Sequence, residues 1–403
     1  MCRELKDSGI PWVGEIPKDW TIELIGNQVK EVNNPNTDGL EDNALQFKMG
    51  TIISKSRGDS KYNPETLEGY NIVDKGVIML NGLNLSFDLI SQRVGLVRER
   101  GVITSTYLAV KPTNNIDSEY LTYLFKAYDN CKAFHSMGRG LRQTLSYGEL
   151  RKYLLLYPSL AEQQRIAEFL DRKCAEVDEM IALQEQIIEE LKAYKQSVIT
   201  EAVTKGLNPA APMRDSEIMF VDKIPSHWKE TKTLRLLSMP ITDGPHETPE
   251  GLDDGIPFIS ADAVSDGYIN FNNKWGYISK EYYEECCKKY IPQRQDIYMI
   301  KSGASTGRTA IVETDEVFTI WSPLAVFRAN KAVILPYFLL YVLRSDSYQK
   351  QVESKWSFGT QQNIGMRTLE KLIISYPSIS EQQAIADYLD EKCADIDSLI
   401  QTK

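Results

Sequence analysis

A segment from the middle of the chain returns near its end. Residues 157–181 and 376–400 lie 219 positions apart and are identical at 15 of 25 positions. A second pair, Asp7–Trp20 and Asp215–Trp228, precedes them at an offset of 208. This period is far longer than the ~20–50 residues of a solenoid repeat. The sequence therefore predicts two similar domains, each followed by one copy of the first segment.

Each copy of that first segment has the pattern of a long amphipathic helix. Both open with proline followed by S-x-x-E, a capping box. Apolar residues recur at helical spacing, and Gly206 followed by Pro209 marks the end of the first helix. A helix from about 160 to 205 would be ~69 Å long. We expect the two helices to pair antiparallel through Leu170, Val177, Ile181, Ile188, Leu191, Leu389 and Ile396.

The segments outside these helices predict domains of mixed structure. Gly101–Lys111 and Thr319–Arg328 have the pattern of strands, and Glu119–Ala133 and Pro336–Val352 that of amphipathic helices. We therefore predict an α+β fold, with two similar mixed α/β domains separated by long antiparallel helices in pseudo-two-fold symmetry. The predicted bounds are 1–158 and 206–377 for the domains, 159–205 for the first helix and 378–403 for the shorter second helix.

Charge is distributed unevenly along the chain. The net charge is −10, but residues 159–205 carry 6 basic and 10 acidic side chains and residues 378–403 carry 2 and 6. The helices thus account for most of the acidity, which leaves nucleic-acid binding open to the near-neutral domains. No apolar run is long enough to span a membrane, so we expect a cytoplasmic protein. The six cysteines form no CxxC pair or His/Cys cluster, and we expect neither a metal site nor disulfides.

A loop of small residues, Lys301–Arg308, carries a cation at each end. It is one residue short of a P-loop and lacks the P-loop lysine, which disfavours nucleotide hydrolysis. Two interpretations stay open. One is a plain hairpin, and the other is a loop that grips a DNA phosphate through backbone N–H groups and Arg308.

Two polar segments, 138–144 and 358–363, occupy equivalent positions in the repeat. Arginine reads guanine and glutamine or asparagine reads adenine, so these segments suit domains that read different bases. An ordinary polar loop before a helix is the alternative. His246, in T-D-G-P-H-E-T-P, has no evident acid or nucleophile partner and is not expected to be catalytic. The candidate DNA contacts are Arg139, Arg142, Gln143, Thr144, His246, Lys301, Ser302, Ser305, Arg308, Gln361, Gln362 and Asn363.

Together these motifs resemble the specificity subunit of type I restriction-modification systems. They are I-P-x-x-W at the start of each half, D-G-P-H-E-T-P, K-S-G-A-S-T-G-R, G-T-Q-Q-N-I and the duplicated Y-P-S-x-x-E-Q-Q helix, of which the last is the specific element. The resemblance implies a non-catalytic subunit that binds double-stranded DNA. Two target-recognition domains would read the halves of a split, asymmetric sequence, with the helices as a ruler between them.

The resemblance also implies partners. Two methyltransferase subunits would dock on the helices, and restriction motor-nuclease subunits would complete the enzyme. S-adenosylmethionine, ATP and Mg²⁺ would be bound by those partners, with no cofactor in this chain. The candidate partner contacts are Glu162, Gln163, Gln164, Glu381, Gln382 and Gln383.

Missing motifs agree with this interpretation. The sequence has no [DNS]PP[YF] or F-x-G-x-G methyltransferase motif and no Walker pair. Two alternatives remain: a specificity subunit that serves a methyltransferase without restriction, and, in a different class, a P-loop-like nucleotide hydrolase centred on 303–309. The second helix has only about half the length of the first. Either the C-terminus has been lost, or something else covers the first helix.

Overall fold

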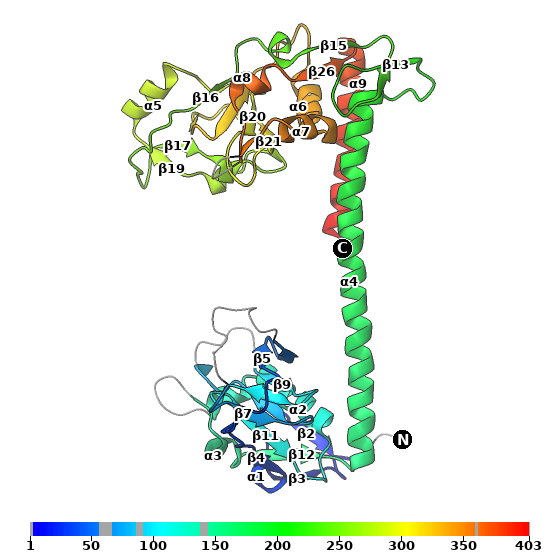
Figure 1. Ribbon diagram of the computed structural model, residues 1–403, viewed down its shortest axis with the longest axis vertical. Helices are drawn as coiled ribbons and strands as arrows, with labels where there is room; N and C mark the ends of the chain where they lie inside the picture. The colour runs from blue at the N-terminus through cyan, green and yellow to red at the C-terminus, as the bar shows by residue number, and fades with distance from the viewer. Residues whose placement is uncertain (1–2, 56–66, 86–91, 138–143, 359–361, 403) are drawn as a thin grey trace. The chain divides into compact units, whose positions relative to one another are not determined.

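The computed structural model describes residues 3–55, 67–85, 92–137, 144–358 and 362–402. The chain forms two compact units, Met1–Met180 and Ile181–Lys403. They divide inside helix α4 (Leu160–Lys205), which is continuous over 46 residues and has the predicted bounds (Figure 1). Each unit therefore contains one domain and one half of this helix, whereas the sequence analysis treated the helix as a separate segment.

The first unit is built on a four-stranded antiparallel sheet. The strand order is β4-β11-β8-β9, with β4 at Val29–Glu31, β11 at Leu108–Pro112, β8 at Ile78–Leu80 and β9 at Val94–Leu96. Helix α2 (Ser118–Asn130) packs against β9. The smaller pairs are β1 (Leu5–Asp7) with β2 (Glu15–Pro17), β3 (Thr21–Leu24) with β12 (Leu154–Tyr157), β5 (Leu45–Lys48) with β6 (Thr51–Ser54), and β7 (Asn71–Val73) with β10 (Gly101–Ile103).

The second unit repeats this topology. Its main sheet has the order β16-β23-β20-β21-β18, with β16 at Thr242–Asp243, β23 at Leu324–Phe327, β20 at Ile297–Ile300, β21 at Thr309–Ile311 and β18 at Gly267–Tyr268. Strands β16, β23, β20 and β21 thus correspond in sheet order to β4, β11, β8 and β9 of the first unit. Helix α6 (Pro336–Arg344) lies on β21 as α2 lies on β9. The other pairings are β13 (Met213–Asp215) with β14 (Lys223–Pro225), β15 (Lys229–Lys232) with β26 (Ile373–Tyr376), β24 (Ser357–Phe358) with β25 (Gln362–Asn363), and β17 (Ile256–Ile259) with both β19 (Gly276–Ile278) and β22 (Thr319–Ile320).

Some predicted elements are divided in the structure. The stretch predicted as one strand at 101–111 forms β10 and β11, which belong to different sheets, and 319–328 forms β22 and β23 in the same way. The helix predicted over 336–352 breaks at Ser345, whose hydroxyl accepts from Tyr348 N–H and caps α7 (Asp346–Glu353). The central strands are buried on both faces, so they lack the alternation that marks a half-buried strand.

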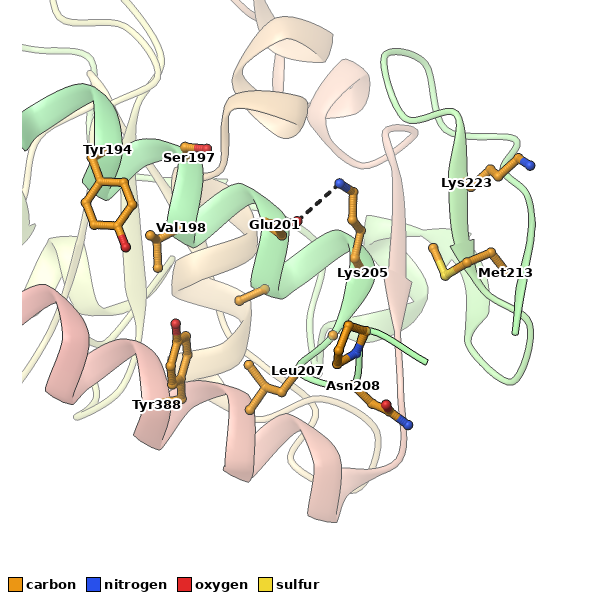
Figure 2. A pocket seen from close by; sticks show the side chains of 13 residues that line it. Tyr194, Ser197, Val198, Glu201, Lys205, Leu207, Asn208, Met213, Lys223 and Tyr388 are labelled. Carbon is orange, nitrogen blue, oxygen red and sulfur yellow. Dashed lines mark hydrogen bonds and ion pairs between the residues drawn. The ribbon is translucent and has the colours of Figure 1, made fainter. Parts of the chain in front are cut away.

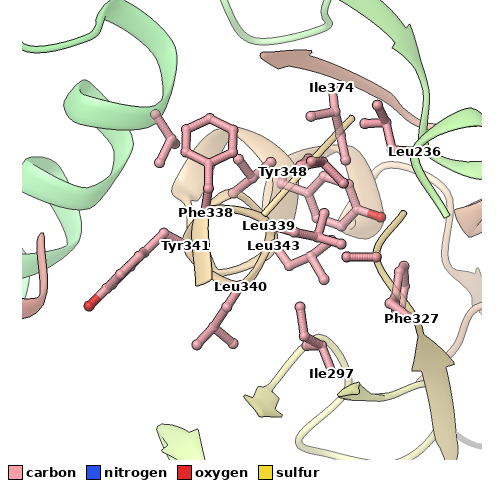
Figure 3. Packing of buried hydrophobic residues seen from close by; sticks show 14 of the residues in the cluster. Leu236, Ile297, Phe327, Phe338, Leu339, Leu340, Tyr341, Leu343, Tyr348 and Ile374 are labelled. Atoms are coloured by element: carbon pink, nitrogen blue, oxygen red, sulfur yellow. The ribbon is translucent and has the colours of Figure 1, made fainter. Parts of the chain in front are cut away.

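The core of the second unit forms between α6, α7 and one face of the main sheet. Figure 3 shows Leu339 and Leu343 of α6 directed into it, with Tyr348 of α7 beside them. These side chains are fully or almost fully buried, and at ~25 cal/mol per Å² of apolar area their burial is the main force holding helix to sheet.

In the second unit the end of α4 packs antiparallel against α9 (Ile379–Gln401). Lys195 Nζ lies 2.9 Å from Asp397 near the end of α9, while Gly206, just after α4, lies beside Glu381 at its start. Leu389 of α9 shares a buried cluster with the α4 segment 198–203. Figure 2 shows the two helices side by side, with Tyr194 and Tyr388 directed toward one another.

The predicted apolar contact between the helices is confirmed only in part. Leu389 and Ile396 are buried, at 0% and 2% exposure. Val177 and Ile181 are instead 47% and 53% exposed, and Leu170, Ile188 and Leu191 are only half-buried. The physical reason is length, because α9 has 23 residues against the 46 of α4 and covers only the end of that helix.

Candidate nucleic-acid interface

The loop Lys301–Arg308 is the hairpin connection between β20 and β21. A phosphate-binding P-loop leads into the N-terminus of a helix, where backbone N–H groups and the helix dipole hold the anion. This loop leads into a strand instead. The alternative of a nucleotide hydrolase centred on 303–309 therefore lacks the structural context that it needs.

The backbone of this loop is largely engaged within the protein. The N–H groups of Lys301, Gly303, Thr306, Gly307 and Arg308 all donate to carbonyl oxygens of the same unit. The predicted grip on a phosphate through backbone N–H groups is thus not available at these positions. The side chains remain, because Arg308 is exposed and its guanidinium forms no hydrogen bond or ion pair with any described residue. Ser302 and Ser305 are half-buried.

The hairpin loop lies beside the second polar segment that the sequence singled out. Gly303 N–H donates to Gln362 O at 3.0 Å, and Ile364 N–H donates to Lys301 O at 2.9 Å. Gln362 is half-buried and Asn363 is exposed. Two motifs that lie about 60 positions apart in the chain thus form one continuous surface.

The T-D-G-P-H-E-T-P motif joins the hairpin loop and the polar segment through the buried carboxylate of Asp243. Asp243, at the end of β16, is 1% exposed, forms ion pairs with Lys289 and with Lys301 Nζ at 3.2 Å, and lies 3.3 Å from His246 Nε2. A buried carboxylate needs such compensation, and in return it holds cationic groups close together. The next residue must be glycine, since a Cβ at Gly244 would lie 1.9 Å from the carbonyl oxygen of Ile320.

This cluster corrects the expectation for His246. The sequence analysis found no acid partner for it, but Asp243 lies three residues earlier and within ion-pair distance. His246 is exposed, as a ligand contact requires. No nucleophile belongs to the cluster, and its charge of two lysines and one carboxylate is positive, which suits a phosphate.

One backbone bond of this arrangement recurs among the described residues of the first unit. Leu145 N–H donates to Gly82 O at 2.8 Å, which matches the bond from Ile364 to Lys301. Gly82 therefore occupies the position of Lys301, and this position carries no cation. Thr144 is exposed beside it. The other predicted contacts in these segments, Arg139, Arg142, Gln143 and Gln361, lie outside the described residues.

The duplicated E-Q-Q segment has a role that the sequence did not reveal. Gln163 and Gln382 are completely buried. The amide of Gln382 donates to Val333 O and Pro377 O, and its oxygen accepts from Leu335 N–H at the start of α6. Gln163 makes the same three bonds to Asn115, Pro158 and Asp117 at the start of α2. Each glutamine thus ties a long helix to its own domain and is not a partner contact.

The neighbouring glutamates are also engaged. Glu162 accepts two hydrogen bonds from Arg3, at 2.6 and 2.9 Å, and these bonds hold the pKa of Glu162 below its usual value. Glu381 accepts from Trp228 Nε1 at 3.0 Å. Neither glutamate closes the predicted capping box, although Ser378 does cap α9. Of the six predicted partner contacts, Gln164 and Gln383 remain as exposed side chains.

The residues missed from the sequence are Asp243 as an organising carboxylate and Lys289 beside it. The T-D-G-P-H motif was noted for its histidine, and nothing in the sequence linked it to Lys289, which follows the end of α5 (Lys280–Cys287). Among the described residues no cluster of His, Cys, Asp or Glu is placed to hold a metal ion. Nor is any helix among these described residues long and apolar enough to cross a membrane.

Comparison with solved structures shows a shared fold. A chain from a study of complex assembly and conformational transition of the type I R-M system superimposes with a TM-score of 0.67, over 96% of this chain and 93% of that one, at 16% identity. The HsdS subunit from Thermoanaerobacter tengcongensis superimposes with a TM-score of 0.53, over 96% and 92%, at 15% identity.

Sequence relatives agree with the structures. The putative MjaX specificity subunit of Methanocaldococcus jannaschii is 30% identical over 97% of this chain and 90% of its own length. The MjaVIII specificity subunit from the same organism is 23% identical over 96% and 88%. The EcoBI specificity subunit of Escherichia coli is 30% identical over 63% of this chain, and that match spans 54% of the relative.

A family model covers more than half of the chain. The type I restriction modification DNA specificity domain matches residues 97–193 and 250–403. Its two matched stretches include most of α4, all of α9 and both polar segments described above. The chain therefore belongs to the type I restriction-modification specificity subunits, the family whose members recognise DNA sequence.

Proposed function

We propose that this chain reads a bipartite, asymmetric DNA target, one half with each unit, and has no catalytic centre of its own. The observation that carries the proposal is the repeated surface. In both units the residue that follows the polar segment donates its N–H to the same strand connection, Leu145 to Gly82 O and Ile364 to Lys301 O, yet the accepting residue is glycine in one unit and lysine in the other. Domains of one topology with different side chains at the reading surface suit two different half-sites.

A domain exchange tests this proposal. Residues 206–377 are replaced by the corresponding domain of another specificity subunit, and the chain is expressed with its methyltransferase subunits. Sequencing of modified bases is expected to show one half of the recognised sequence changed and the other kept. A change in both halves, or in neither, contradicts the assignment of one half-site to each unit.

Lys301→Ala is expected to weaken DNA binding by a similar factor for all sequences, because an ammonium contacts phosphate as a point charge. The slope of log K against log salt should fall by about one. Titrations by fluorescence anisotropy at several salt concentrations measure this slope. Lys331→Ala, at an exposed lysine outside the surface, is the matched control. A loss confined to particular base pairs would make Lys301 a base contact.

Arg142→Ala is expected to relax base preference in the first half-site by about 1–3 kcal/mol, since arginine reads guanine with two hydrogen bonds. Competition binding against single-base variants of the target measures the preference. Arg98→Ala, which removes an ion pair with Glu119 outside the polar segment, serves as the control. An equal loss against every variant would place Arg142 on the phosphate backbone.

We further propose that two methyltransferase subunits and restriction motor-nuclease subunits assemble on this chain and bring S-adenosylmethionine, ATP and Mg²⁺ with them. The relatives are specificity subunits of restriction enzymes, which supports this assembly.

The exposed glutamines test the docking of the methyltransferase. Gln164→Ala with Gln383→Ala is expected to weaken capture of the methyltransferase subunit about tenfold, as for central interface residues. The control is Glu185→Ala, in the middle of α4. Undiminished capture would remove these glutamines from the interface. Gln163 and Gln382 are unsuitable for this test, because their replacement would disturb folding.

A further inference from the structure

A small cavity of ≈ 250 Å³ opens in the second unit beside the cluster around Asp243. It lies between the T-D-G-P-H motif, helix α5 with the residues that follow it, and Thr319 at the start of β22. One wall is fixed in place, because Gly244 packs directly on the backbone of Ile320. Cavities for drug-sized ligands have about 300–1,000 Å³, so this one suits a smaller group, of the size of a single base.

Two tyrosines line this cavity. Tyr290 is buried, and its hydroxyl is already hydrogen-bonded to Asp296 and Tyr298. The Oη of Tyr282 is also buried but has no hydrogen-bond partner among the described residues. Burial raises the pKa of Tyr282, so its hydroxyl is protonated and able to donate. Buried polar groups are nearly always hydrogen-bonded in native proteins, and the acceptor that Tyr282 lacks is one that a ligand in the cavity supplies.

The cavity also offers acceptors and one cation. Asp243 lines it, and its buried Oδ2 forms no hydrogen bond with any described residue, although Lys301 Nζ lies 3.2 Å away. Glu247 lines it too, and its side chain has no hydrogen bond or ion pair with the described residues. Lys289, paired with Asp243, is 48% exposed at the same cavity. A fitting ligand therefore donates N–H groups to carboxylates, accepts from Tyr282 and has an anionic group within reach of Lys289.

A nucleotide with a keto base has all three properties. On the edge used for base pairing, thymine and guanine each present a ring N–H beside a carbonyl oxygen, whereas adenine and cytosine have no ring N–H there. The phosphate is the anionic group, and lysine is a common contact of DNA phosphates. Thymine and guanine are also the pairing partners of adenine and cytosine, the two bases that DNA methyltransferases modify.

Methylation leaves such a base without its partner, because an enzyme that modifies a base takes it out of the stack into its own active site. We propose that the cavity beside Asp243 holds the unpaired base opposite the target and so stabilises the opened duplex. Tyr282 donates to its carbonyl oxygen, the carboxylates of Asp243 and Glu247 accept from its N–H groups, and Lys289 contacts its phosphate. This proposal rests on the proposed function, from which the DNA target and the methyltransferase subunits are taken.

A thermodynamic cycle tests the role of the cavity. The full chain, assembled with its methyltransferase subunits and S-adenosylhomocysteine, is titrated with its target duplex. It is also titrated with the same duplex carrying an abasic nucleotide opposite the target base of the second half-site. Tyr282→Phe is expected to weaken binding of the intact duplex about fivefold, as the loss of one buried hydrogen bond does. On the abasic duplex it should have no effect, because no base reaches the hydroxyl.

Tyr283→Phe is the matched control, since it removes the same group one residue further along α5, at a position that does not line the cavity. It should bind both duplexes as the unaltered chain does. The inference is overturned if Tyr282→Phe affects the two duplexes by equal factors or affects neither, or if Tyr283→Phe discriminates between them equally. Such a result with sequence preference intact contradicts this inference alone. Absence of sequence preference in the unaltered complex would overturn the proposed function and this inference with it.

Discussion

Gln382→Ala is expected to lower the free energy of unfolding of the second unit by about 2–4 kcal/mol. The substitution removes a buried amide and leaves Leu335 N–H and the carbonyls of Val333 and Pro377 without their partner. An unpaired buried polar group costs about 1–3 kcal/mol, and water that enters the space recovers part of that cost. Urea unfolding followed by tryptophan fluorescence measures the change.

The repeat supplies matched controls for this experiment. Gln163→Ala should destabilise the first unit by a similar amount, because its three bonds are equivalent. Gln164→Ala and Gln383→Ala should stay within about 0.5 kcal/mol, since both side chains are exposed. If the buried and exposed glutamines gave equal changes, the ties between helix and domain would not be structural.

Deletion of residues 179–182 from α4 is expected to shorten the unspecified gap of the DNA target by about two base pairs. Four residues remove ~6 Å of helix, and the phase of the two ends changes by only ~40° because four residues exceed one turn by that angle. The deleted segment lies in the stretch of α4 that is exposed in the described structure, so neither domain core is cut. Sequencing of modified bases in cells that carry the shortened chain reads the gap directly.

Two control variants distinguish the effect of the length of α4 from the effect of its residue composition. Met180→Ala with Ile181→Ala keeps the length and should keep the gap. Deletion of two residues turns the helix ends by ~200° relative to each other and should abolish recognition. An unchanged gap in the four-residue deletion would show that α4 does not act as a ruler between the half-sites.

Local patterns were enough to predict the long helix and the two-fold repetition of the domain. The bounds of α4 follow from the proline and S-x-x-E pattern at its start and the glycine after its end, which act within a few residues of the chain. The break at Ser345 was missed, because an amphipathic pattern continues across it while a single hydroxyl stops the helix. The stretches 101–111 and 319–328 were likewise each predicted as one half-buried strand, although each forms two shorter strands in different sheets.

Less of the candidate surface than of the fold could be predicted from the sequence. Three motifs were recognised separately, and nothing local indicated that Lys301 joins them, through its carbonyl to Ile364 and through its ammonium to Asp243. Such contacts are made between strands that are distant in the chain. The first glutamine of each E-Q-Q, Gln163 or Gln382, was assigned to a partner for the same reason, because its bonding groups lie mainly in another part of the domain.

By itself, the sequence determined that one unit occurs twice, that a helix of about 46 residues follows its first copy, and which family the chain resembles. These features depend on identity between copies and on interactions a few residues apart. Only the tertiary structure decided which apolar residues of the helices are covered and which polar groups meet at Lys301. Burial depends on what packs against a side chain: Leu389 is completely buried, whereas its copy Leu170 is only half-buried.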